Sequence, residues 1–267
     1  MASALAAALV RDGGLWREIR VVAETGSTNE DVAAAAGAGA PEGLVIVAEA
    51  QTAGRGRFER RWVSPPGAGL TFSALLRPGS AVPLARWSWL PLLAGLSLQR
   101  AVSRLTGLDA AVKWPNDLLL GPDRRKAAGL LVQAGDGAAV LGIGLNVTTT
   151  AAELPDAGAT SLSAEGAGAE GTDRERVLRA VLEQLAEDYL AWRAARGDPA
   201  ASRLRSGYLE VCDTVGRQVR VTQPDGTELA GTAAAVDPSG RLVLHTPDGD
   251  RAVSAGDVQH VRPVPDA

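Results

Sequence analysis

The chain has 267 residues, enough to bury a large core and to carry a small appended unit beside one main domain. Its 46% hydrophobic and 22% charged residues are ordinary for a globular protein and exclude disorder of the chain as a whole. The net charge of −4 argues against a general nucleic-acid binder, and one cysteine with two histidines argues against a disulfide framework and a zinc site.

Residues 1–10 are apolar and rich in alanine, but no basic residue precedes the apolar run. The segment is far shorter than the roughly 20 apolar residues that span a bilayer. We therefore expect a helical arm, no membrane partner and a location in the cytoplasm.

Strands and helices alternate in the first half of the chain. Alternating apolar residues predict a strand over residues 17–23. Ser27 and Glu30 form the pattern of a capping box, which predicts a helix that begins there and runs to Gly37. Pro83 opens a second, long apolar helix. Further strands are predicted over residues 44–49, 70–76, 112–120, 127–133 and 140–147.

The composition changes after residue 147. Residues 148–172 lack a clear periodicity and predict a surface loop, whereas Asp173 caps a helix whose apolar residues recur at intervals of three and four. A shorter helical piece follows, and then short strands separated by turn signals predict a small β-barrel. The predicted fold class is therefore α+β, with a mixed-sheet domain over residues 1–211 and an all-β domain over residues 212–267.

A loop rich in glycine and arginine lies between two predicted strands. Gly54 and Gly56 lack side chains, so the backbone there can approach a ligand closely. Arg55 and Arg57 offer planar guanidinium groups to carboxylate or phosphate oxygens. The pattern predicts a mobile lid that holds an anion, although a solvated basic loop would have the same composition.

A second polar cluster, Lys113 to Asp117, contains a proline that makes a rigid corner. Asn116 and Asp117 supply oxygens of the kind that orient a magnesium–nucleotide, or they simply form a turn. Lys126 begins an apolar run, so its ammonium either reaches solvent or faces a buried anion. A third cluster, residues 142–146, combines two glycines with Asn146 and is weak evidence by itself.

Together the motifs resemble those of the biotin–protein ligase family, in order and in spacing. The resemblance covers most of residues 20–163. It implies a catalytic domain of the biotin/lipoate ligase type with a mixed β-sheet, followed by a small SH3-like β-barrel. The matching segments are Gly-Ser-Thr-Asn at 26–29, Gln-x-x-Gly-Arg-Gly-Arg at 51–57, Lys-Trp-Pro-Asn-Asp at 113–117, Arg-Lys-x-Ala-Gly at 125–129 and Gly-Ile-Gly-Leu-Asn at 142–146.

The resemblance also implies roles for individual residues. Lys126, Arg55 and Arg57 are expected to act in catalysis, Lys126 on the biotin carboxylate and the α-phosphate and the arginines in a loop over the intermediate. Asp117 is the expected ligand of Mg²⁺. The residues expected around biotin and ATP are Ser27, Thr28, Asn29, Gln51, Gly54, Arg55, Gly56, Arg57, Trp62, Lys113, Asn116, Asp117, Lys126, Gly129, Gly144 and Asn146.

The implied reaction has two steps. Biotin and ATP form biotinyl-5′-AMP, and a lysine of a biotin carboxyl carrier domain, part of an acyl-CoA carboxylase, then takes the biotinyl group. Charge neutralisation and positioning are the main requirements of such chemistry. In the loop, Phe58-Glu59 stands where the family usually has a small residue or glycine.

Two alternatives remain open at this point. A lipoate or octanoate ligase has the same overall fold but lacks the Gly-Arg-Gly-Arg loop. A biotin-sensing repressor carries a helix-turn-helix unit ahead of the same domain, and the residues before Arg17 are too few for one. We therefore expect a monofunctional ligase that does not bind nucleic acid.

Overall fold

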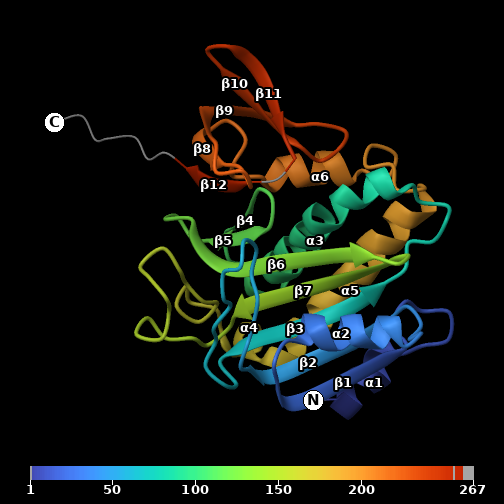
Figure 1. Cartoon of the computed structure of the whole chain (residues 1–267). Coiled ribbons are helices and arrows are strands. Elements are labelled where there is room, and N and C mark those ends of the chain that lie inside the picture. Colours follow the sequence, from blue (N-terminus) through green and yellow to red (C-terminus); the bar gives the residue numbers. More distant parts are fainter. Residues whose placement is uncertain (1, 255, 261–267) are drawn as a thin grey trace.

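The structure, a computed structural model, describes residues 2–254 and 256–260. A seven-stranded mixed sheet carries helices on both faces, and a five-stranded antiparallel sheet lies beside one end of it (Figure 1). In the first part the elements are α1 (Ala2–Leu9), β1 (Glu18–Thr25), α2 (Thr28–Gly37), β2 (Leu44–Gln51), β3 (Gly69–Leu76), the 3-10 helix η1 (Leu84–Trp89), α3 (Leu90–Thr106), β4 (Ala110–Lys113), β5 (Asp117–Leu120), β6 (Arg125–Gly135) and β7 (Ala138–Asn146).

The helices α4 (Ala169–Thr172), α5 (Arg174–Ala194) and α6 (Leu204–Val211) follow the large sheet. The small sheet then contains β8 (Gln218–Thr222), β9 (Glu228–Val236), β10 (Leu242–Thr246), β11 (Gly249–Val253) and β12 (Asp257–His260). The predicted α+β class is confirmed. In the described residues, no helix is long and apolar enough to cross a membrane.

The large sheet has the order β1-β2-β3-β7-β6-β5-β4, and β1 pairs with β2 in parallel while the other neighbours are antiparallel. Helices α3 and α5 cover one face, and α2 covers part of the other over β2, β3 and β7 (Figure 1). Every residue of β7 is therefore buried, which explains its continuous apolar sequence.

Two helix boundaries follow from local chemistry. The side chain of Asp173 accepts hydrogen bonds from the backbone N–H groups of Glu175 and Arg176, so it caps α5 as expected. Gly107, with φ 71°, ends α3 in the left-handed conformation that glycine adopts most easily. Pro83 precedes η1, which leads directly into α3.

The structure corrects three expectations. Residues 112–120 do not form one strand, because Pro115 cannot donate a ladder hydrogen bond; β4 and β5 instead pair as a hairpin around it, with a cis Trp114–Pro115 bond. Ser27 is the N-cap of α2, but its side chain makes no capping bond, and Glu30 pairs with Arg55 instead. Residues 148–172 are not all at the surface, since residues 159–162 are buried beside the sheet.

The small sheet has the order β11-β10-β9-β8-β12 and matches the predicted SH3-like type. No ladder joins β11 to β12 in the described part of the chain, so the sheet is barrel-like without being a closed ring. It is fastened to the β4–β5 hairpin: the indole of Trp114 donates to the carbonyl of Gly240 (3.0 Å), and its backbone N–H donates to the Thr214 hydroxyl (3.0 Å). This contact brings β12 to the edge of the site.

Candidate active site

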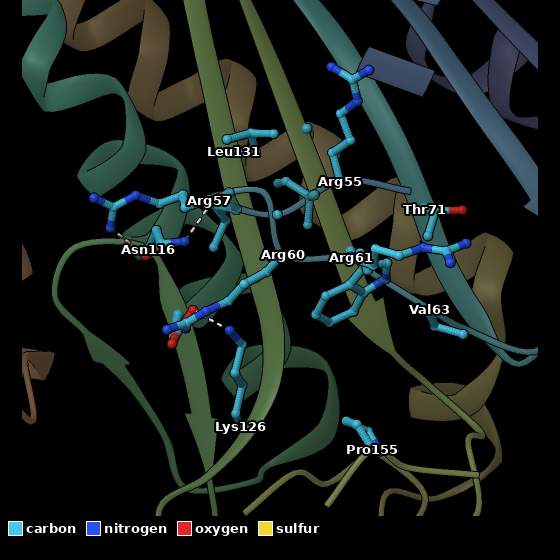
Figure 2. A pocket seen from close by; sticks show the side chains of 18 of the residues that line it. Arg55, Arg57, Arg60, Arg61, Val63, Thr71, Asn116, Lys126, Leu131 and Pro155 are labelled. Atoms are coloured by element: carbon cyan, nitrogen blue, oxygen red, sulfur yellow. Dashed lines mark hydrogen bonds and ion pairs between the residues drawn. The ribbon is translucent and has the colours of Figure 1, made fainter. Parts of the chain in front are cut away.

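A cavity of about 520 Å³ lies over β3, β6 and β7, beneath the loop that joins β2 to β3 (Figure 2). The N-terminus of α2 forms one end, the β4–β5 turn and residues 155–159 form the other, and β12 closes one side. All residues predicted around biotin and ATP line this cavity except Gly54. The carbonyl of Gly54 accepts the N–H of Trp62 (3.0 Å) at the base of the loop.

One end of the cavity is a chain of neutral hydrogen bonds. Gln51 Oε1 accepts from the Thr28 N–H (2.8 Å), and the Thr28 hydroxyl lies 2.7 Å from the Ser73 hydroxyl. Ser73 in turn donates to Asn29 Oδ1 (2.6 Å), and Asn29 Nδ2 donates to Gln133 Oε1 (2.9 Å). Each member fixes the orientation of the next, so this end presents preorganised neutral donors and acceptors.

Glycines on β6 and β7 make room for the groups that lie over the sheet. A Cβ at Gly142 would overlap the side-chain amide of Asn29, and one at Gly144 would overlap the indole of Trp62. At Gly129 a Cβ would lie 3.3 Å from the Trp62 ring and 3.5 Å from Lys126 Nζ. Gly142 and Gly144 therefore require glycine for close approach rather than for backbone freedom, and a side chain at Gly129 would crowd the same groups.

Lys126 is placed by an irregularity in β6. Leu118 pairs with Ala128 but Leu119 pairs with Lys126, so one strand carries an extra residue and the side chains are re-aimed there. On its other side, the Lys126 N–H donates to the carbonyl of Gly158 (2.7 Å). The ammonium lies 2.7 Å from Asp117 Oδ1, at the cavity. A cation with a fixed backbone can neutralise an anion without first reorganising.

The β4–β5 turn has both structural and ligand-facing parts. Asn116 Nδ2 donates to the carbonyl of Leu130 (2.8 Å), and its Oδ1 accepts from Arg57 (3.1 Å). Lys113 lies opposite Asp117 in the hairpin ladder. Asn146, at the end of β7, donates to the carbonyl of Thr160 (2.9 Å), which ties the buried segment 159–162 to the sheet. The simple turn considered for these residues is thus present, and it faces the cavity.

The arginine loop, defined as residues 54–62, folds back on itself through a bridge between Arg55 and Arg61. Arg55 pairs with Glu30 of α2, whereas Arg57 extends in another direction toward Asn116 (Figure 2). Burial lowers the pKa of the Arg57 guanidinium, and the nearby Asp117 carboxylate opposes that effect. Arg57 and Lys126 therefore form a cationic end of the cavity beside the β4–β5 turn, away from the neutral end at α2.

Sequence reasoning missed several residues of the site. Ser73 and Gln133 join the neutral chain, yet both lie inside apolar strands where no local signal marks them. No motif in the sequence singles out Arg60 or Asp257, although both line the cavity. Phe58 and Glu59 have φ of 53° and 60°, a left-handed conformation that explains a preference for glycine there.

Among the described residues, no group of three or more histidine, cysteine, aspartate or glutamate side chains could hold a metal ion. Asp117 is a single carboxylate, and Lys126 already contacts it. Mg²⁺ in nucleotide sites binds through one or two carboxylates together with phosphate oxygens and water. The residues present therefore fit an ion that arrives with a nucleotide.

The fold and the site define an α+β enzyme domain that can hold a neutral polar group at one end of a cavity and neutralise an anion at the other. The Biotin/lipoate A/B protein ligase family matches residues 25–149, and the Biotin protein ligase C terminal domain matches residues 214–261. The chain belongs to this ligase family, and its resemblance to the biotin–protein ligases is confirmed.

The similarity extends along nearly the whole chain. The biotin–[acetyl-CoA-carboxylase] ligase of Mycobacterium tuberculosis is 40% identical over 95% of this chain and 93% of its own length. The bifunctional ligase/repressor BirA of Bacillus spizizenii is 33% identical over 82% of this chain and 67% of its own length. The structure of the biotin protein ligase of Aquifex aeolicus in complex with biotin and ATP has a TM-score of 0.74 at 26% identity, and covers 93% of this chain and all of that one.

Proposed function

We propose that this chain forms biotinyl-5′-AMP from biotin and ATP and transfers the biotinyl group to a lysine of a biotin carboxyl carrier domain. The observation that carries the proposal is the polarity of one cavity, in which the neutral chain from Gln51 to Gln133 lies at one end and Lys126 with Arg57 at the other. Biotin has a matching polarity, with a neutral ureido ring and a carboxylate.

In the first step a carboxylate oxygen of biotin attacks the α-phosphorus of ATP and pyrophosphate leaves. Thr28, Asn29 and Gln51, with Ser27 beside them, orient the ureido ring, so the carboxylate reaches the cationic end. Lys126 neutralises the carboxylate and the α-phosphate oxygens as they approach one another. Asn146, Gly129 and Gly144 shape the floor beneath them.

In the second step the acceptor amine attacks the carbonyl carbon of the mixed anhydride, and AMP leaves with the bonding electrons. Arg55 and Arg57 of the arginine loop cover the intermediate and keep water out until the acceptor arrives. Asp117 and Asn116 would hold Mg²⁺ together with the phosphates. When bound, that ion supplies further charge neutralisation.

The name of the Mycobacterium tuberculosis relative supports a carboxylase carrier domain as the acceptor. ATP as a substrate supports a location in the cytoplasm, and the match of residues 214–261 supports a domain boundary at residues 211–212. The family description includes lipoate ligases, but the curated relatives that match along the chain are biotin ligases, which favours biotin. Because BirA is also a repressor, the absence of nucleic-acid binding stays a prediction.

The test is an intact-mass measurement after incubation with biotin and Mg-ATP, with lipoate and Mg-ATP in parallel. We expect a tightly retained biotinyl-AMP and no lipoyl-AMP. Lys126→Ala is the matched variant and should retain far less adenylate after the same short incubation. Retention of lipoyl-AMP alone, or of no adenylate by the parent chain, would contradict the proposed function.

A further inference from the structure

The tip of the arginine loop touches the small sheet at two adjacent residues. Arg57 Nη1 donates to the carbonyl of Gly256 (3.3 Å), and Arg60 makes two bonds to the carboxylate of Asp257 (3.1 and 2.5 Å). Gly256 and Asp257 belong to the C-terminal part of the chain, almost 200 residues away in sequence. The loop that covers the cavity is thus fastened to a different sheet from the one that carries it.

The geometry of the tip explains why two anchors are used. Phe58 and Glu59 form a turn with positive φ at both residues, a conformation that costs a non-glycine residue about 1–2 kcal/mol. Arg57 and Arg60 flank this turn, and the Arg60 N–H donates to the Arg57 carbonyl (3.2 Å). Holding both ends against one dipeptide keeps the tip in this conformation.

The two partner residues are fixed by the packing of the small sheet. Asp257 pairs with Thr222 in the ladder between β12 and β8, and a Cβ at Gly256 would overlap the side chain of Val221. Burial raises the pKa of the Asp257 carboxyl, but the hydrogen bonds and charge of Arg60 outweigh burial, so the net pKa is lowered. The carboxylate is therefore ionised near neutral pH and available to the arginine.

We propose that Asp257 is a positioning residue that holds the arginine loop closed through Arg60, and so keeps biotinyl-AMP in the cavity until the acceptor lysine arrives. This inference rests on the proposed function and names a specificity determinant within it. An adenylate that leaves early acylates any accessible amine, so the hold on the loop sets the selectivity for the acceptor.

The exposure of the pair sets the size of the effect. The Arg60 side chain is 62% exposed and that of Asp257 is 28% exposed. Ion pairs with this exposure would shift the equilibrium between the closed and the open loop by about 1.4- to 5-fold. A weak hold suits a lid that must open in every catalytic cycle. Loss of Asp257 should therefore accelerate loop opening severalfold and leave the fold in place.

The experiment uses the full chain loaded with labelled biotinyl-AMP and follows its dissociation during a chase with unlabelled biotin. Asp257→Asn should release it about 1.4- to 5-fold faster and should label albumin faster by the same factor per pyrophosphate formed. Arg60→Gln should reproduce both changes. Asp250→Asn removes an exposed carboxylate of β11 that pairs with His245, and should change neither.

Reversal of the pair separates positioning from general damage. Arg60→Asp combined with Asp257→Arg should restore slow release, while each single reversal should accelerate it. Release at the parental rate from Asp257→Asn, or fast release from a folded double reversal, would overturn the inference alone. A parent chain that forms no pyrophosphate from biotin and ATP would overturn the proposed function and this inference with it.

Discussion

Replacing Gly142 by alanine should damage the biotin end of the cavity through a single methyl group. The new Cβ would overlap Asn29 Oδ1 and lie 2.9 Å from its Cγ. The Asn29 side chain can move away, but it would then lose its bonds to Ser73 and Gln133. The damage therefore comes from a broken hydrogen-bond chain rather than from strain in β7.

The magnitude follows from these bonds. Two hydrogen bonds, one buried and one partly buried, at roughly 1 kcal/mol each give a loss of about 2 kcal/mol in the free energy of unfolding, or about 4–8 °C in Tm. At the site, Asn29 is displaced from the biotin end of the cavity. Ser73 then no longer has Asn29 as its acceptor, so the Thr28 hydroxyl that contacts Ser73 is also less firmly oriented. We expect a loss of about 1–3 kcal/mol in biotin binding, which is roughly a 5- to 150-fold rise in the biotin KM.

The assay measures pyrophosphate release against biotin and against ATP, with thermal unfolding in parallel. The control is Gly135→Ala on β6, where a Cβ would meet nothing within 4 Å. We expect the biotin KM to rise in Gly142→Ala alone, with the ATP KM nearly unchanged. Equal rises in both KM values, or a biotin KM that matches the control, would refute the reasoning.

Three further predictions concern charged groups. Lys126→Ala should slow adenylate formation about 30- to 1000-fold, and it should also lower Tm because the Asp117 carboxylate loses its cation. Adding Asp117→Asn should restore Tm but not the rate. Near-normal pyrophosphate release by Lys126→Ala would contradict this prediction. Burial and the charge of Lys113 lower the pKa of His260 to about 4, so its contribution to stability is full above about pH 6.5 and lost as the pH falls toward 4. Urea unfolding at several pH values should show that the parent protein loses about 3 kcal/mol in its free energy of unfolding over this pH range. The loss should be absent in His260→Gln and present in His245→Gln. The same pH dependence in His260→Gln and in the parent would contradict the prediction. Arg57→Gly should label albumin faster than the parent at matched pyrophosphate release, and equal labelling would mean that Arg57 does not gate the cavity.

Much of the site could be predicted because its residues lie in short local motifs. Thr28 and Gln51 meet since β1 and β2 are parallel neighbours, so the carboxyl ends of the two strands lie at the same edge of the sheet. The cation at Lys126 and the turn at Asn116 were also recognisable from their sequence neighbours. In such motifs the strand or turn that carries a side chain also fixes where that side chain lies in the site.

Other features of the site depend on contacts between residues that are distant in sequence, and the local sequence does not predict these contacts. Glu30 fits a capping box, but its carboxylate pairs with Arg55, and sequence alone does not decide between a backbone N–H and a guanidinium that a distant loop supplies. Ser73 joins the hydrogen-bond chain only through the registers of β3 against β2 and β7. Asp257 reaches the cavity because Trp114 and Thr214 fix the small sheet against the hairpin.

The position of β12 along the chain has a consequence for biosynthesis. A ribosome that has translated through α6 has already made the neutral end, Lys126 and the arginine loop, but the wall formed by Asp257 and its neighbours has not been synthesised. A nascent or prematurely terminated chain would therefore have a cavity open on that side and an arginine loop without its contacts to Gly256 and Asp257. The full hold on the loop, and with it the slowest release of the reactive adenylate, is therefore acquired only after β12 has been synthesised.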